Sequence, residues 1–481
     1  MPEFKKDLTS GNVFKQLLGF SVPFLLANLL QALYSVVDMI VVGQYVGPIG
    51  VSSVQVGSQV MQLIINMVSG LGVGATVMIA QYQGAGKDDD QKKTIGTLFT
   101  VFFIISVAVT AIMMIFNSRI LHLLGADGEV FDDAASYMLI CSAGSIFTFG
   151  YNAVSGILRG MGDSVRPLVF VGIAAGCNIV LDVVFVGVLG LRAAGAAWAT
   201  VISIALSFVL SVIYLRKKSF VFDFKPSSFK IDREKLRLIL RIGLPTSVQF
   251  SITGFSFLIL TGLSNSILPV VGSSVLGIAS KLNTFGILAC IAMSSSISSM
   301  SAQNIGAGKF DRAKKTMWCG MGMAFAVSVA VFAIINLFPN AIINLFMSPN
   351  GLSGDELSLY EQCMSIGPTY LRLASFDYLI ACVFFCTNGL ATGSGHTFFS
   401  LINSAVNSLA VRVPLAYILA YSFGMGVNGV AAALGFAPII SAVVGLIYVN
   451  TNRWKKPVMH LGDNLNESNG VAEKTSAEKQ Q

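Results

Sequence analysis

The stretch GFSVPFLLANLLQALYSVVDMIVVGQYVG, residues Gly19 to Gly47, decides how this chain folds. A helix rises about 1.5 Å per residue, so about 20 apolar residues are enough to cross the hydrocarbon layer of a bilayer. Pro23 removes one backbone donor and bends such a helix, which membrane bundles tolerate because neighbouring groups satisfy the freed carbonyl. The stretch therefore predicts a membrane-spanning helix that carries a carboxylate, Asp38, towards its far end.

Asp38 is the unusual residue of this helix. A carboxylate inside a membrane span is costly, so it normally faces a bundle interior or a water-filled cavity. The alternative is that Asp38 lies at the helix end, among lipid headgroups. A mostly apolar run follows Asp38 before Gln44, which favours an intramembrane position.

Composition extends the membrane prediction to the whole chain. Of its 481 residues, 54% are hydrophobic and 11% are charged, and the mean hydropathy is +0.74. A soluble domain carries about 25% charged residues. The first twelve residues are polar and the first apolar run is longer than the core of a signal peptide, so no cleavable signal peptide is expected.

Cysteine and histidine give no sign of a cofactor or a structural metal. The seven cysteines lack the spacing of a disulfide framework and read as small buried apolar residues. The three histidines, His122, His396 and His460, are far apart in the sequence and show no metal-ligand spacing. We expect no cofactor and no metal other than Na⁺ as a coupling ion.

The apolar runs predict an all-α membrane protein with twelve transmembrane helices. The first six are expected near 13–42, 50–80, 94–118, 132–158, 166–190 and 193–215, and the second six near 236–265, 272–302, 314–343, 359–391, 398–423 and 426–450. They define an N-terminal segment (1–12), a six-helix bundle (13–215), a basic linker (216–235), a second six-helix bundle (236–450) and a disordered tail (451–481).

The distribution of positive charge predicts the orientation. If the N-terminus is cytoplasmic, 26 of the 31 Lys and Arg residues lie in cytoplasmic segments and two lie outside, while Lys281, Arg372 and Arg412 fall inside spans. Positive residues collect on the cytoplasmic side of membrane proteins. We therefore expect a multi-pass protein of the cell membrane with both termini cytoplasmic, and we interpret the net charge of +7 as a topology signal without nucleic-acid binding.

The two halves of the chain repeat each other. Pro23 pairs with Pro245, and the segment AQYQGAGK at 80–87 pairs with AQNIGAGK at 302–309, both at an offset of 222 residues. Glycines further along pair at offsets of 233 and 234: Gly156, Gly160 and Gly162 with Gly389, Gly393 and Gly395, and Gly190 and Gly195 with Gly424 and Gly429. Two six-helix halves of the same direction predict pseudo-symmetric bundles around a cavity near the membrane midplane.

The Gly-Lys pairs in the repeated segment also raise the alternative of a phosphate-binding loop. That motif requires a glycine five residues before the second glycine, and Ser or Thr after the lysine. Gln81 and Asp88 occupy these places in the first copy, and Gln303 and Phe310 occupy them in the second. A helix end closed by glycines is the better interpretation.

Four segments together resemble the multidrug and toxic-compound extrusion (MATE) family, in its DinF-like bacterial branch. They are VVDMIVVGQYVG at 36–47, AQYQGAGK at 80–87, GILRGMGDSVRP at 156–167 and NIVLDVVFVGVLGLRAAGAAWAT at 178–200. The resemblance covers about residues 10 to 450. It implies two bundles forming a V and export of organic cations driven by inward H⁺ or Na⁺, through a cation site at Asp38, Asn178, Asp182 and Thr200. The family's acidic residue in the seventh span is Thr253 here, which leaves a second-bundle ion site without support.

The residues of this site have suitable chemistry. Asn178 and Asp182 are four apart and share a helix face. Carboxylate, amide and hydroxyl oxygens suit a hard cation, and a buried carboxylate near another one readily takes up a proton. The alternative is a structural hydrogen-bond network between spans.

Two further groups are candidates for function. Adaptable Met and aromatic side chains suit a chamber that accepts many ligands, and we expect drug-like substrates to meet Gln31, Tyr34, Met61, Phe149 and Asn152. A lone charge in a span is costly, so we expect a second-half charge network in which Asp377 pairs with one of the cations Lys281, Arg372 and Arg412. Ordinary packing and a static clamp are the respective alternatives.

The leading hypothesis is thus a secondary antiporter, expected to act as a monomer in the lipid bilayer and to export amphipathic, often cationic compounds by alternating access. A flippase or exporter of an anionic, lipid-linked precursor is the second transport hypothesis, and the three cations of the second half are its support. An enzyme would require a nucleophile–base or metal constellation, and none is visible.

Overall fold

The computed structural model describes residues 6–124, 128–217, 220–268, 271–347, 354–456 and 458–459. These residues form helices joined by loops, with no strand in any of the six ranges. Contacts divide them into two compact units. The first contains the chain up to Ser247 together with Ala302–Lys309 and Met459, and the second contains Val248–Ser301 and Phe310–Val458.

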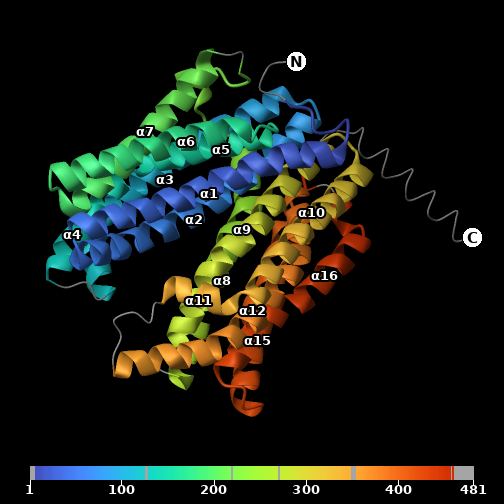
Figure 1. The fold of residues 1–481 in the computed structure, drawn as a ribbon. Helices are drawn as coiled ribbons and strands as arrows, with labels where there is room; N and C mark the ends of the chain where they lie inside the picture. Colours follow the sequence, from blue (N-terminus) through green and yellow to red (C-terminus); the bar gives the residue numbers. More distant parts are fainter. Residues whose placement is uncertain are drawn as a thin grey trace, which may run out of the picture. The chain divides into compact units, whose positions relative to one another are not determined.

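The first unit is built from long, apolar helices that lie side by side and are coloured blue to green in Figure 1. Their order is α1 (Val13–Tyr45), α2 (Pro48–Gly84), α3 (Asp88–Leu123), α4 (Glu129–Ala143), α5 (Ser145–Gly160), α6 (Val165–Asp182), the π-helix η1 (Val183–Val188), α7 (Arg192–Lys217), the short 3₁₀ helix η2 (Pro226–Ser228) and the beginning of α8 (Arg233–Ile267).

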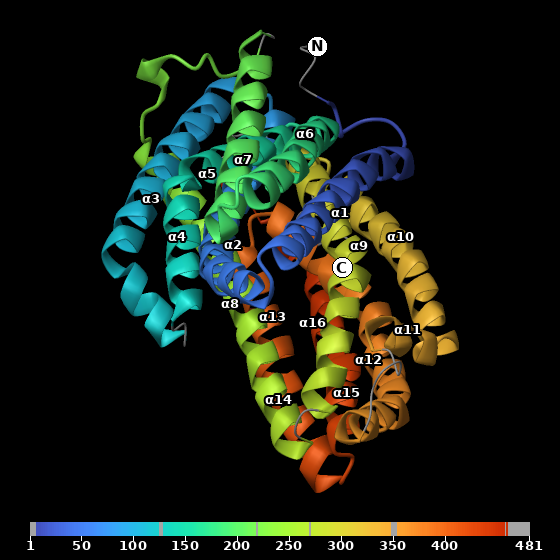
Figure 2. The same cartoon turned by 60° about the vertical axis from the view of Figure 1, so that its left-hand side comes forward.

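The second unit repeats this plan with the yellow to red helices, which Figure 2 shows from another side. They are the rest of α8, most of α9 (Val271–Gly306), α10 (Phe310–Leu337), α11 (Pro339–Phe346), α12 (Asp355–Gly393), α13 (Thr397–Ala405), the π-helix η3 (Val406–Val411), α14 (Arg412–Tyr417), the π-helix η4 (Ile418–Ser422), α15 (Val427–Phe436), α16 (Pro438–Asn450) and η5 (Arg453–Lys455).

The expected twelve spans are found. Within the described ranges, eleven helices or helix runs are long and apolar enough to cross a membrane. The twelfth is a pair, α4 and α5, bent by 49° where one meets the other. The bend falls at Gly144, where a Cβ atom would lie 2.4 Å from Cγ2 of Val201 in α7. Gly144 thus permits close approach of α7 at this break in a span that the hydropathy pattern shows as continuous.

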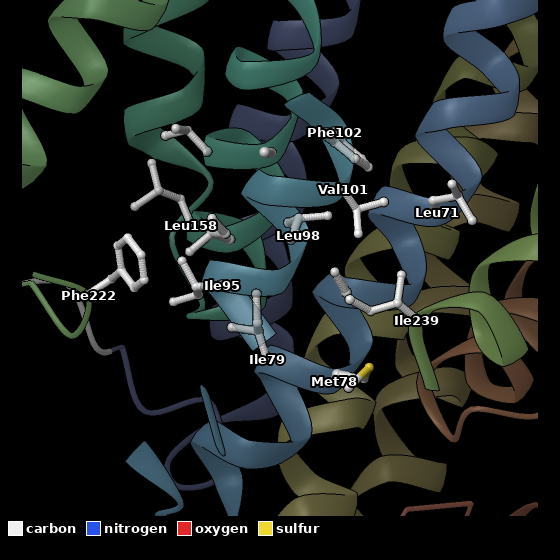
Figure 3. Packing of buried hydrophobic residues seen from close by; sticks show 14 of the residues in the cluster. Leu71, Met78, Ile79, Ile95, Leu98, Val101, Phe102, Leu158, Phe222 and Ile239 are labelled. Carbon is white, nitrogen blue, oxygen red and sulfur yellow. The ribbon is translucent and has the colours of Figure 1, made fainter. Parts of the chain in front are cut away.

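A continuous apolar core holds the first unit together. Buried side chains of α2, α3, α5 and α8 interdigitate there, among them Met78, Leu98, Leu158 and Ile239 (Figure 3). Phe222 of the linker between α7 and α8 belongs to the same cluster and lies beside Ile95 at the start of α3. The basic linker is thus packed onto the bundle. Of the predicted tail, residue 457 and residues 460–481 lie outside the described residues.

Candidate ion-coupling site

Two carboxylates from different helices meet inside the first unit. Asp38 comes from the last third of α1 and is 8% exposed, while Asp182 is the last residue of α6 and is fully buried. The two side chains lie within hydrogen-bonding reach of each other. The packing of α1 along α6 brings them together, so residues 144 positions apart in sequence share one site.

Apart from each other, the two carboxylates find few hydrogen-bond partners among the described residues. Among the described residues, no hydrogen-bond donor reaches Oδ1 of Asp38 or either carboxylate oxygen of Asp182, and Asn178 has neither a donor for its Oδ1 nor an acceptor for its Nδ2. Buried polar groups are almost always hydrogen-bonded, because leaving one unpaired costs about 1–3 kcal/mol. Five such atoms are concentrated on Asp38, Asn178 and Asp182, where a bound proton or cation would satisfy the oxygens among them.

Two buried carboxylates that lie close together cannot both stay ionised unless another charge compensates them. One carboxylate must hold a proton, or a cation must lie between them. No Lys or Arg in the described part of the chain forms an ion pair with either one. The geometry therefore suits exchange of a small cation better than a static salt bridge.

The helix changes its hydrogen-bonding pattern directly after Asp182. The π-helix η1 occupies Val183–Val188, and such bulges frequently mark functional sites. Gly187 in this segment allows the Tyr45 ring of α1 to approach closely, since a Cβ there would lie 3.0 Å from Cζ of that ring. Val42, Val186 and Ala197 belong to a separate apolar cluster, which joins α1, η1 and α7 next to this segment.

The structure adds residues that the sequence did not suggest. Tyr137 and Cys141, one turn apart on α4, interact electrostatically with Asp38. Tyr34 on α1, predicted from the sequence to line the substrate chamber, does so too. Neither α4 residue stands out from its apolar span, because only the packing of α4 against α2 and α7 places it here. Thr200 of α7, expected as a fourth ligand, is half-buried, and its role stays a prediction.

The five residues predicted to line the substrate chamber differ in their exposure. Gln31 is exposed, and Tyr34 and Asn152 are half-buried. Met61 and Phe149 are buried: the Met61 sulfur accepts a hydrogen bond from Ser142, and Phe149 packs edge-on against Phe102. These two contribute packing in this structure, and their contact with a substrate stays a prediction.

The charged residues of the second unit do not form the expected compact network. Asp377 and Arg412 are both buried and interact electrostatically, yet no ion pair within 4.0 Å joins them. Arg412 instead lies 5.4 Å from the centre of the Phe257 ring. Asp377 lines a cavity of about 20 Å³, the space of a single water molecule, together with Asn283. Lys281 and Arg372 are exposed, and neither forms an ion pair with Asp377.

The sequence matches the family model described as MatE over residues 23–184 and 245–418, which is more than half of the chain. The chain belongs to the MatE family. The two matched segments begin at Pro23 and Pro245, the prolines that the internal repeat pairs, so each half of the chain is one MatE repeat.

Individual MatE proteins agree with this assignment. The probable multidrug resistance protein YpnP of Bacillus subtilis is 27% identical, and the match covers 93% of this chain and 97% of YpnP. A solved MOP superfamily transporter from Pyrococcus furiosus, described as having a binding pocket of reverse polarity, matches with a TM-score of 0.86 and 26% identity over 93% and 98% of the two chains. An outward-facing multidrug resistance MATE transporter matches with a TM-score of 0.85 and 26% identity over 92% and 97%. This MatE chain is a membrane transporter with the family's two-bundle helical fold.

Proposed function

We propose that this protein exports amphipathic, often cationic compounds in exchange for inward H⁺ or Na⁺, and that Asp38 and Asp182 carry the coupling ion. The observation that supports this most is the buried carboxylate pair without cationic partners. Several MatE relatives are named as multidrug resistance or multidrug export proteins, which supports drug-like substrates.

The coupling step requires a group that changes charge or coordination inside the membrane. Protonation of the pair, or binding of Na⁺ between its oxygens and Oδ1 of Asn178, would remove the repulsion between the two carboxylates. Loss of that ion would restore the repulsion and favour separation of α1 from α6. The site would thus couple ion occupancy to the position of α1, which contains Pro23.

The energy available sets what the exchange can do. One positive charge moving inward across 100 mV releases about 2.3 kcal/mol, and each 1.4 kcal/mol maintains a tenfold concentration ratio. One net inward charge per cycle therefore sustains a gradient of a neutral substrate of roughly fortyfold. A monovalent cationic substrate cancels this charge, so its export requires a second driving cation or a chemical ion gradient.

The coupling ion can be identified in proteoliposomes. The protein is reconstituted with a fluorescent cationic dye, and efflux is recorded separately with an imposed proton gradient and an imposed sodium gradient. We expect one of these gradients to drive dye movement. If neither gradient changes dye movement relative to protein-free liposomes, the antiport proposal is wrong.

The second transport hypothesis rests on Arg412. Its guanidinium is buried in the second unit, and its Nε has no acceptor among the described residues, so it offers a positive group that an anionic substrate would satisfy. Asp377 interacts with the same side chain and weakens this case. Transport of a fluorescent anionic lipid analogue, with no response to cationic dyes, would favour a flippase over drug export.

The orientation is part of the proposal and has its own test. Ser227 lies in the exposed linker that we assign to the cytoplasm. In a variant without the seven native cysteines, S227C should resist a membrane-impermeant thiol reagent in intact cells and react after permeabilisation. Labelling from outside would reverse the proposed topology.

A further inference from the structure

The linker between α7 and α8 folds back onto the first turns of α3 within the first unit. The Thr97 hydroxyl accepts a hydrogen bond from the backbone N–H of Asp232 at 3.0 Å and donates one to the carbonyl of Lys230 at 3.4 Å. Gly96 permits this contact, because a Cβ there would lie 2.3 Å from the Ser228 carbonyl oxygen. The backbone of the linker is therefore anchored on α3 by the Thr97 hydroxyl and by close packing at Gly96.

Between this linker and α3 lies a cleft of about 450 Å³. Three of its lining residues are lysines, two of them at the start of α3 and the third in the linker: Lys92, Lys93 and Lys230. Its two carboxylates come from the linker, at Asp223 and Asp232. Whether the cleft attracts an anion depends on which of these charges are already compensated.

The carboxylates are compensated by the protein itself. Asp223 accepts hydrogen bonds from the Ser228 hydroxyl at 2.6 Å and the Lys225 backbone, and the Ser228 bond lowers the pKa of this carboxyl. Asp232 accepts the first backbone N–H groups of α8, from Glu234 and Lys235. Both acids therefore act as turn and helix caps and stay ionised. Asp223 lies 3.6 Å from Lys225, and Asp232 lies at the positive end of the α8 dipole, so the three lysines carry the excess charge of the cleft.

The lysines have no comparable partners. Lys92 lies 3.6 Å from Asp89, but both side chains are at least half exposed, so this pair contributes little. In the described part of the chain, neither Lys93 nor Lys230 forms an ion pair or a side-chain hydrogen bond. The cleft thus presents ammonium groups that are free to bind an anion.

The position of the cleft indicates which anion. The apolar run of α3 starts after Lys93, and that of α7 ends before Arg216, so the cleft lies at the level where both spans leave the hydrocarbon. Phe229 and Ile231, on either side of Lys230, are 37% and 41% exposed. Exposed apolar side chains beside lysines are typical of segments at a membrane surface that carries anionic lipids.

We propose that Lys93 and Lys230, assisted by Lys92, bind the phosphate group of an anionic membrane lipid in this cleft. The lysines supply the charge, and Phe229 and Ile231 contact the beginning of the acyl chains. Because the linker connects the two repeats along the chain, a lipid bound here would stabilise the packing of the linker on α3.

The test uses the full-length protein in a neutral detergent with added phosphatidylglycerol, phosphatidylcholine or inorganic phosphate. Phosphatidylglycerol should raise the unfolding temperature in a saturable way, while the other two should not. Each lysine near a charged lipid surface contributes about 1 kcal/mol, so the variant K93Q/K230Q should bind phosphatidylglycerol roughly 30-fold more weakly. A charge-matched control, K15Q/K456Q, should respond like the unchanged protein, because both lysines are exposed and distant in sequence from the cleft.

Folding of the variant is checked without lipid, where its unfolding temperature should match that of the unchanged protein because neither side chain has a partner. The charge-preserving variant K93R/K230R provides a second check and should keep the response to phosphatidylglycerol. An equal response of K93Q/K230Q and K15Q/K456Q would overturn the proposal. So would stabilisation by inorganic phosphate alone, which would indicate a soluble phosphate ligand, or no response of the unchanged protein to phosphatidylglycerol.

Discussion

Gly84 at the end of α2 is in backbone contact with Gln303 near the end of α9: a Cβ on Gly84 would lie 1.9 Å from the Gln303 carbonyl oxygen. The reciprocal contact is also present, because a Cβ on Gly306 would lie 2.0 Å from the carbonyl oxygen of Gln81. Gly84 pairs with Gly306 and Gln81 with Gln303 at the repeat offset of 222. The glycines of the repeated AQxxGAGK segment therefore allow its two copies to pack against each other symmetrically.

This contact predicts that G306A destabilises the protein. Backbone atoms of α2 must move to admit the methyl group, and overpacking of this kind costs about 1–3 kcal/mol. The matched control is G277A on the same helix, where no atom lies within 4 Å of the added Cβ and the better helix propensity of alanine should help slightly. Thermal unfolding in detergent measures both. An unfolding temperature of G306A equal to or above that of G277A would contradict the contact.

The ion pair between Lys235 and Asp90 predicts that replacing Asp90 lowers the stability of the protein more than replacing Lys235 does. Its buried ammonium lies 2.8 Å from Oδ1 of Asp90 and 2.9 Å from the Tyr82 hydroxyl. Replacing Asp90 by Asn leaves a buried cation without its main partner, which should cost about 3 kcal/mol. Replacing Lys235 by Met leaves Asp90, which water reaches because its side chain is 31% exposed, and should cost about 1 kcal/mol. The double variant should unfold at a higher temperature than D90N alone, and additive losses would refute the pairing.

The sequence predicted the parts of this molecule that depend on local composition. The twelve spans follow from hydropathy, the repeat follows from its constant offset, and Asn178 and Asp182 share a face because they are four apart. The break at Gly144, the π-helix after Asp182 and the position of Tyr137 beside Asp38 depend on which helices pack together, and no local pattern reports that. The docked linker was also missed, because its lysines resemble an ordinary basic loop until Thr97 and Gly96 place it on α3.

The repeat shows why the described residues of the second unit have no counterpart of the carboxylate pair Asp38 and Asp182. At the offset of 222, Asp38 corresponds to Leu260, which is fully buried. At the later offsets of 233 and 234, Asp182 corresponds to Leu415 or Ala416. Both acidic positions are therefore apolar in the second half, where Asp377 lies elsewhere and interacts with Arg412.

Asp377 and Arg412 are expected to depend on each other for stability. D377N should leave the Arg412 guanidinium buried without its electrostatic partner and lower the free energy of unfolding by about 3 kcal/mol. D377N combined with R412Q should recover part of this loss, whereas D377N combined with K281Q should not, because Lys281 is exposed. Urea or thermal unfolding in detergent gives the comparison. Recovery with K281Q and not with R412Q would show that the partner is assigned to the wrong cation.

A substitution in the carboxylate pair is expected to abolish ion coupling while leaving substrate binding intact. Asn in place of Asp182 keeps the size of the side chain but cannot exchange a proton and binds Na⁺ more weakly. D182N should therefore fold and bind a cationic dye in detergent, yet lose dye efflux driven by an ion gradient. S164A serves as the control, because its buried hydroxyl lies at the opposite end of α6. Loss of dye binding together with efflux would instead assign Asp182 to substrate recognition.

The most direct measurement of the central claim is gradient-driven dye efflux from proteoliposomes containing the D38N/D182N double variant, compared with the unchanged protein at equal protein density. If Asp38 and Asp182 carry the coupling ion, the double variant binds dye but shows no efflux above protein-free liposomes with either a proton or a sodium gradient. Efflux at a rate near that of the unchanged protein would show that the driving ion binds elsewhere and would contradict the account.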